Sequence, residues 1–183
     1  MSLLATPRMR IRHATEADAS ALWRFRIENR EHLAPWEPLR EERYYTPGHC
    51  VQTIADWREA IRLDRGYAFL VFTPDESEVI ASFNLANLVR GVFQACHLGY
   101  AVAQRSQGQG VMQEALEHGL AWAFGPLGLH RVMANYMPRN ERSGRLLERL
   151  GFEREGYAKR YLCIAGEWED HVLTALIHPQ SQG

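Results

Sequence analysis

The sequence predicts a single domain of the α+β, or mixed α/β, class with a mostly antiparallel sheet. Its 183 residues contain 46% apolar and 23% charged side chains, which is the composition of one globular domain. No repeat, low-complexity tract or Pro/Gly/Ser-rich linker divides the chain, so we expect one domain over 1–183 with its core at about 9–178. Strand-like and helical patterns follow in an order that combines antiparallel hairpins with one β-α-β crossover.

The first third of the chain is predicted to be mainly helical. Residues 9–13 alternate in polarity and indicate a first strand. Thr15 has an acidic residue three positions on, the pattern of a helix N-cap, and we expect that helix to run to about Asn29. Residues 30–38 contain two prolines and are expected to form an ordered loop with a helical turn. A second helix is expected over 46–66, because proline is favoured in the first turn and glycine ends a helix.

The rest of the chain is predicted to contain three consecutive strands, a crossover helix, a strand, a helix and a final hairpin. Turn residues such as Pro, Gly, Asp and Ser separate these segments, and the apolar spacing distinguishes strands from helices. The expected strands are 67–73, 79–89, 93–102, 131–136, 155–164 and 168–177, and the expected helices are 111–124 and 141–150.

Composition excludes several classes of function. The net charge is −1 and the pI about 6.7, whereas a protein that binds DNA or RNA broadly needs a basic excess. The longest apolar run has six residues and the N-terminus lacks the pattern of a signal peptide, so we expect neither a membrane span nor secretion. Cys50, Cys96 and Cys163 have no metal-site spacing, and we expect reduced, buried thiols in a cytoplasmic protein that needs no metal.

A glycine-containing loop at 104–110 is the most informative motif. Gly108 and Gly110 allow a tight turn and close approach of a ligand, and the free N–H groups of the following helix suit a phosphate. An ATP-binding P-loop needs Lys and Ser/Thr after the last glycine, where Val111 stands, and a Rossmann motif needs a third small residue where Gln113 stands. A plain surface turn is the remaining alternative, and the strand before and helix after the loop favour anion binding.

The segment Arg105-Ser106-Gln107-Gly108-Gln109-Gly110 resembles the acyl-CoA pyrophosphate loop of the GNAT acetyltransferases. The resemblance continues through 135–143 and through 146–156 with its Leu-Gly-Phe step. It implies helices on both faces of the sheet and acetyl-CoA as cosubstrate. The cofactor contacts that it implies are Tyr100, Ala101, Val102, Arg105, Gln107, Gly108, Gln109, Gly110, Val111, Asn140 and Ser143. By residue type alone, Asn140 is also a plausible N-cap and Ser143 a first-turn residue that bonds locally.

Several further segments are similar to one subtype, the RimJ type of bacterial ribosomal-protein-alanine N-acetyltransferases. They are 28–30, 33–38, 87–91, 97–100 and 155–171, so the similarity covers about 10–176. It implies direct transfer of acetyl to the α-amine of an N-terminal alanine of a ribosomal protein, by a monomer or homodimer. The alternatives are acetylation of a small amine, such as an aminoglycoside, polyamine or amino acid, and a non-catalytic acyl-CoA-binding ribosome assembly factor.

The candidate catalytic residues follow from what the transfer requires. Thiols titrate near pH 8.5, so a hydroxyl near the sulfur is sufficient, and Ser143 is the first candidate, ahead of Tyr157 and Tyr161, which could equally be packing residues. At neutral pH roughly a tenth of an α-amine is unprotonated, against less than a thousandth of a lysine. A weak base is therefore enough, and the strand 93–102 offers only His97 and no carboxylate.

The candidate acceptor site is formed by residues of the first third of the chain. Asn29, Trp36 and Glu37 are expected to line a peptide groove, in which Glu37 attracts the ammonium group. Trp36 could instead fix the proline-rich loop. Arg139 or Arg142 could pair with the 3′-phosphate of CoA.

Overall fold

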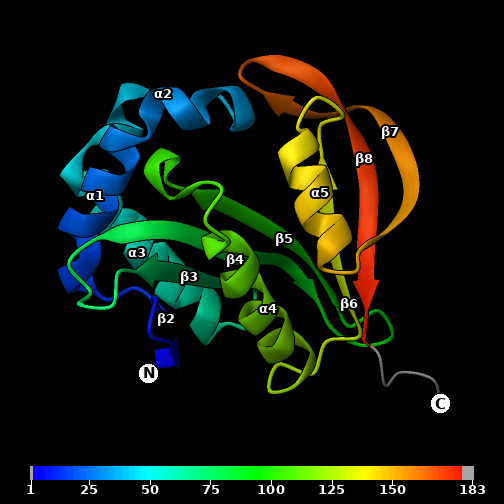
Figure 1. Cartoon of the computed structure of the whole chain (residues 1–183), viewed down its shortest axis with the longest axis horizontal. Helices are drawn as coiled ribbons and strands as arrows, with labels where there is room; N and C mark the ends of the chain where they lie inside the picture. Colours follow the sequence, from blue (N-terminus) through cyan, green and yellow to red (C-terminus); the bar gives the residue numbers. More distant parts are fainter. Residues whose placement is uncertain (1, 179–183) are drawn as a thin grey trace.

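The computed structural model describes residues 2–178, with side chains from residue 5 onward, and it has the predicted mixed α/β fold (Figure 1). One sheet of eight strands has the order β1-β2-β3-β4-β5-β6-β8-β7, and every neighbouring pair is antiparallel except β5–β6. The strands are β1 (Ser2–Ala5), β2 (Arg10–Arg12), β3 (Tyr67–Phe72), β4 (Val79–Val89), β5 (Ala95–Val102), β6 (Arg131–Tyr136), β7 (Glu153–Ile164) and β8 (Glu167–Ile177). The helices are α1 (Ala19–Glu28), α2 (Arg30–Leu33), α3 (Pro47–Arg62), α4 (Val111–Phe124) and α5 (Glu141–Arg149), with 3-10 turns η1 (Glu16–Asp18), η2 (Ala34–Trp36), η3 (Glu42–Tyr45) and η4 (Gln104–Ser106).

The sheet separates two apolar cores. Along β3, Phe69 and Val71 face the core beneath α4, whereas Leu70 and Phe72 face the core beneath α1 and α3. Successive side chains of a strand point to opposite faces, so this strand is apolar throughout because both faces are covered. The expectation of helices on both faces is confirmed.

The sheet forks between its two parallel strands. Residues 95–97 of β5 pair with 131–133 of β6, and the pairing stops there although β5 continues to Val102 and β6 to Tyr136. The C-terminal ends of the two strands therefore diverge, with α4 and α5 on one side of the opening (Figure 1). Backbone groups along this edge of β5 are available to a ligand.

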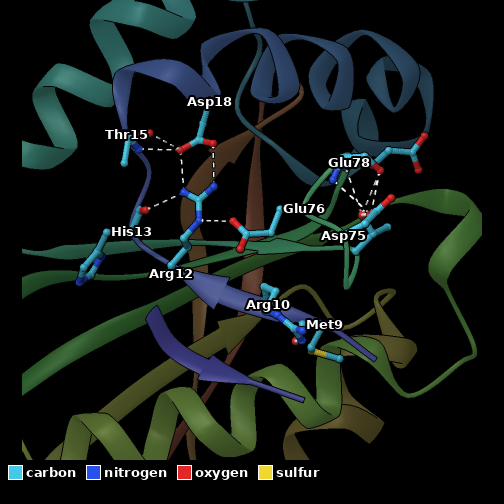
Figure 2. A network of polar contacts seen from close by, with 11 residues as sticks. Met9, Arg10, Arg12, His13, Thr15, Asp18, Asp75, Glu76 and Glu78 are labelled. Carbon is cyan, nitrogen blue, oxygen red and sulfur yellow. Dashed lines mark hydrogen bonds and ion pairs between the residues drawn. The ribbon is translucent and has the colours of Figure 1, made fainter. Parts of the chain in front are cut away.

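A partly buried ionic network anchors the N-terminal end of the sheet (Figure 2). Arg12 on β2 donates to both carboxylate oxygens of Asp18, at 2.7 and 2.9 Å, and to Glu76 in the β3–β4 turn, at 2.7 Å. Burial acts to raise the pKa of Asp18, and hydrogen bonds from Arg12 and Thr15 outweigh it and lower the pKa below its usual range. The network fixes the start of α1 against the turn that carries Glu78, a neighbour of the glycine loop.

Most expected elements lie within a few residues of their expected bounds, and three features differ. The N-terminus forms strand β1, which no pattern indicated. The proline-containing segment 30–38 is more helical than expected and forms α2 and η2. Cys50 and Cys96 are buried as expected, but Cys163 is exposed because β7 is an edge strand.

Candidate active site

A cleft of about 980 Å³ lies between the glycine loop, the end of β5 and α5. Nine of the eleven predicted cofactor contacts line it, namely Tyr100, Ala101, Val102, Gln107, Gly108, Gly110, Val111, Asn140 and Ser143. These residues are distant in sequence and meet because the fork in the sheet brings the loop after β5 opposite the helix after β6. The size suits an extended small-molecule ligand.

Two left-handed glycines shape the loop at the start of α4. Gly108 has φ +70° and Gly110 has φ +76°, a region that other residues rarely adopt. A Cβ placed on Gly108 would meet no atom within 4 Å, so the backbone faces open space here. The first helical bond of α4 runs from the Glu114 N–H to the Gly110 carbonyl, at 3.0 Å, and the preceding N–H groups are free for an anion.

Arg105 and Gln109 do not line the cleft, unlike the other predicted loop contacts. Arg105 donates to Glu78 at 2.7 Å, and Gln109 donates to the Arg105 carbonyl at 2.7 Å. Arg8, which sequence reasoning missed, donates to the Gln109 carbonyl at 2.5 Å. These side chains support the loop from outside the cleft, and contact of Arg105 and Gln109 with the cofactor stays a prediction.

Asn29 also braces the loop. Its side chain is only 4% exposed, accepts from the Gln104 N–H at 2.8 Å and donates to the Phe25 carbonyl at 2.8 Å. With both ends of the amide bonded internally, Asn29 has little left to offer a substrate. The structure therefore makes it a residue that ties the end of α1 to the glycine loop, and it also lines a small hollow beside the cleft.

Four arginines of α5 and the turn before it line the opposite wall. They are Arg139, Arg142, Arg145 and Arg149. Arg142 donates to the Gln107 side chain, which also bonds His32 at 3.1 Å, and Arg149 donates to Gln113 at 3.1 Å. Within residues 2–178, Arg142 and Arg149 have neutral partners and no carboxylate, so the wall carries uncompensated positive charge.

The N-terminus of α5 brings two hydroxyls together beside the fork. Asn140 caps the helix by accepting from the Ser143 N–H at 3.2 Å, as its residue type predicted. The Ser143 hydroxyl lies 2.5 Å from the hydroxyl of Tyr100 on β5. From the sequence, Tyr100 and Ser143 are expected only as separate cofactor contacts, because nothing local relates positions 43 residues apart.

The other predicted catalytic groups lie elsewhere. Tyr157 donates to Asp170 at 2.8 Å and Tyr161 accepts from Asn135 at 3.3 Å, and neither lines the cleft beside Ser143. His97 points to the opposite face of β5 from Tyr100, its buried Nδ1 has no partner within residues 2–178, and burial lowers its pKa. The structure thus does not place the two tyrosines or His97 in the cleft beside Ser143.

A second, smaller hollow of about 60 Å³ adjoins the cleft. The two share Leu33 and Ala101, and the smaller one is also lined by Glu37. Trp36 lines the larger cleft, where the Arg139 guanidinium lies 5.0 Å from its ring. Trp36 thus lines the larger cleft and Glu37 the smaller hollow, and their contact with an acceptor stays a prediction.

Hydrogen bonds beside this junction connect the segment that follows α2 to the C-terminal part of the chain. The Ala165 N–H donates to the Glu37 carbonyl at 2.8 Å, and Arg139 donates to the Pro35 carbonyl at 3.3 Å and to Glu169 at 2.9 Å. These contacts hold η2 against the β7–β8 hairpin, near which α2 lies in Figure 1.

Two classes of site are absent from residues 2–178. No cluster of His, Cys, Asp and Glu there is arranged to hold a metal ion. None of the helices in this part of the chain has the length and apolar character needed to cross a membrane.

A forked sheet with an anion-binding loop after β5 and a capped helix after β6 defines an acyl-CoA-dependent acyltransferase. Residues 8–153 match the acetyltransferase (GNAT) domain family, and the chain belongs to this family. This confirms the predicted N-acetyltransferase.

Individual relatives are similar over nearly their whole length. The chain is 47% identical to the [ribosomal protein uS5]-alanine N-acetyltransferase of Escherichia coli, over 96% of this chain and 91% of that protein. The ribosomal-protein-S5-alanine acetyltransferase of Vibrio fischeri has a solved structure that matches at TM-score 0.94 and 36% identity over 100% of both chains. RimJ of Mycobacterium smegmatis, solved with CoA-disulfide, matches at TM-score 0.88 and 29% identity over 96% of this chain and 84% of that one.

Proposed function

We propose that this protein transfers acetyl from acetyl-CoA to the α-amine of an N-terminal alanine, on a small-subunit ribosomal protein. The observation that carries the proposal is the junction of two hollows at Leu33 and Ala101, a large cleft for the coenzyme and a small one for the acceptor. The identity of 47% to the E. coli enzyme that acts on uS5 alanine supports this acceptor. A ribosomal acceptor places the reaction in the cytoplasm.

The large cleft fits acetyl-CoA as cosubstrate. The pyrophosphate lies against the open backbone at Gly108, the left-handed turn at Gly110 and the free N–H groups of α4. The pantetheine arm lies along the edge of β5 beyond His97, where the fork leaves backbone groups without a strand partner. Arg142 and Arg149 exchange their neutral glutamine partners for phosphate oxygens, since a charge-assisted bond is stronger than a neutral one.

The small hollow fits the acceptor. Its volume of about 60 Å³ is on the order of four water sites, enough for an amino group with a methyl side chain and too small for a bulky residue. Glu37 lines it and supplies a carboxylate for the ammonium group, although Arg40 lies 3.4 Å away and screens part of that charge.

The chemistry needs little proton transfer from the protein. Because the α-amine has a pKa near 7.7–8.0, about a tenth or more is already neutral at pH 7. The neutral amine attacks the thioester carbonyl directly, without a covalent enzyme intermediate. The departing thiolate is stabilised by a hydroxyl, for which Ser143 is the candidate within the cleft.

Mass spectrometry on a peptide panel tests the proposed function. Peptides that begin with alanine should be acetylated at the N-terminus and leave internal lysines unmodified, and peptides that begin with leucine or phenylalanine should react much more slowly. An Nα-blocked alanine peptide with a free lysine is the matched control. Preferential acetylation of that lysine, or of spermidine or an aminoglycoside over every peptide, would overturn the proposed acceptor.

A further inference from the structure

In the hydrogen bond between Tyr100 and Ser143, the identity of the donor determines what the Ser143 hydroxyl can do in the reaction. The two hydroxyl oxygens are 2.5 Å apart, and both residues line the coenzyme cleft. Either hydroxyl can donate to the other, and the choice decides where the proton of Ser143 points. Tyr100 directly precedes Ala101, which lines both hollows, so the backbone that carries Tyr100 runs beside the place where the proposed function brings thioester and amine together.

The surroundings of Tyr100 decide the direction. Within residues 2–178 its hydroxyl bonds only Ser143, and burial raises the pKa of Tyr100 to about 12, with the bond to Ser143 acting in the opposite sense. If Ser143 donated, the largely buried tyrosine proton would have no acceptor within residues 2–178, which is unfavourable. If Tyr100 donates, its proton is satisfied and the Ser143 proton is free to turn into the open cleft.

We infer that Tyr100 is a positioning residue that donates to Ser143 Oγ and thereby directs the Ser143 hydroxyl proton toward the sulfur of the departing coenzyme. The inference rests on the proposed function for the location of the thioester. Ser143 then stabilises the charge that develops on sulfur as the bond to carbon breaks.

The step balances without a proton from either hydroxyl. The amine nitrogen forms a bond to the acetyl carbon, the carbon–sulfur bond breaks, and its electron pair goes to sulfur. The proton that the nitrogen loses is the proton that the thiolate gains. Tyr100 keeps its own proton, because its pKa of about 12 lies well above the value near 8.5 of a thiol.

Steady-state kinetics on Ser143→Ala, Tyr100→Phe and the double variant test the inference. Ser143→Ala should lower kcat by about ten- to a hundredfold and Tyr100→Phe by about three- to tenfold, with the KM for acetyl-CoA nearly unchanged in both. The double variant should be no slower than Ser143→Ala alone, because Tyr100 acts only through Ser143. Ser143→Thr, which keeps the hydroxyl, should restore most of kcat.

A matched control and independent readouts keep the result interpretable. Tyr136 places its hydroxyl over Gly144, the next residue of α5, without a bond to Ser143, and Tyr136→Phe should keep kcat. Calorimetric titration with CoA and thermal melting should show each variant folded with unchanged coenzyme affinity. A Tyr100→Phe variant that loses coenzyme affinity would show a structural hydroxyl and overturn the inference.

Two further outcomes of the kinetic experiment would contradict the inference. Full kcat in Tyr100→Phe, or losses that multiply in the double variant, would show that Tyr100 does not act through Ser143. The comparison uses whichever amine the wild type acetylates. If that amine is not an alanine peptide, the proposed acceptor fails while the pattern among the variants still tests the Tyr100–Ser143 pair.

Discussion

Gly108 and Gly128 adopt almost the same left-handed backbone conformation, with φ +70° and +68°, and a Cβ on either would meet nothing within 4 Å. They differ in location, because Gly108 lines the coenzyme cleft and Gly128 lies in the turn between α4 and β6. The pair therefore separates the cost of strain from the cost of blocking the ligand.

For Gly108→Ala and Gly128→Ala we expect similar losses of stability, about 1–2 kcal/mol each from the left-handed conformation. Only Gly108→Ala should also weaken acetyl-CoA binding, by roughly tenfold or more, because its methyl group projects into the space that the pyrophosphate needs. Urea unfolding and calorimetric titration measure the two effects. Equal affinities for acetyl-CoA in the two variants would contradict the assignment of the loop.

Arg142 and Arg145 provide a second comparison on one helix. Arg142 meets the neutral Gln107 side chain, whereas Arg145 is already compensated by Glu141 at 3.0 Å. Arg142→Met should therefore weaken acetyl-CoA binding by about five- to thirtyfold, within the range of a charge-assisted phosphate contact. Arg145→Met should cost less, and a titration at rising salt should reduce the difference between the two variants. A larger loss in Arg145→Met would place the phosphates further along α5.

At the scale of elements, α4 is fitted closely against the sheet. A Cβ on Gly119 would lie 2.6 Å from the buried ring of Phe83, which in turn stacks on Phe69 at 4.8 Å. Neither ring is free to move, because both are almost fully buried. The glycine thus sets the distance between the crossover helix and β4, and with it the position of the glycine loop at the helix N-terminus.

Gly119→Ala and Gly48→Ala are expected to change stability in opposite directions. Alanine favours a helix over glycine by up to about 1 kcal/mol. At Gly119 the clash with Phe83 outweighs this, and we expect a net loss of about 1–3 kcal/mol. At Gly48, in the first turn of α3, no atom lies within 4 Å and a small gain is expected. Denaturant unfolding of both variants measures the signs, and a stabilised Gly119→Ala would show that the core can yield.

At the scale of the whole molecule, partly buried histidines link stability to pH. Burial lowers the pKa of His13, His49 and His97 below 6.5, with nearby arginines adding to the effect at His49. Below about pH 6.5 the unfolded chain takes up protons that the folded chain resists, so the free energy of unfolding is full above that pH and decreases as pH falls through the folded-state values.

His13→Gln should make this decrease less steep. Glutamine can keep a bond to the Ala68 carbonyl, which His13 Nδ1 approaches at 2.7 Å, but it cannot titrate. Urea unfolding at pH 7.5, 6.5 and 5.5 measures the slope for wild type and variant. His130→Gln is the control, since His130 is exposed. An unchanged slope in His13→Gln would assign the acid sensitivity to other groups.

The sequence by itself determined the order and type of most elements and the location of the glycine loop, because these depend on neighbours a few residues apart. The alternation in 79–89, the apolar spacing in 111–124 and the glycines at 108 and 110 are local signals. Strand β1 was missed because a four-residue edge strand is defined by its pairing with β2 and carries no strong pattern of its own.

Only the tertiary structure decided how the site is assembled. Asn29 bonds the Gln104 N–H as well as lining the small hollow, and Tyr100 meets Ser143 while Tyr157 and Tyr161 bond elsewhere. These contacts join residues 13 to 75 positions apart, and they depend on the strand order, the register and the point at which β5 and β6 separate. Residue type states what each group can donate or accept, whereas the packing of α4 and α5 on a forked sheet selects the partner.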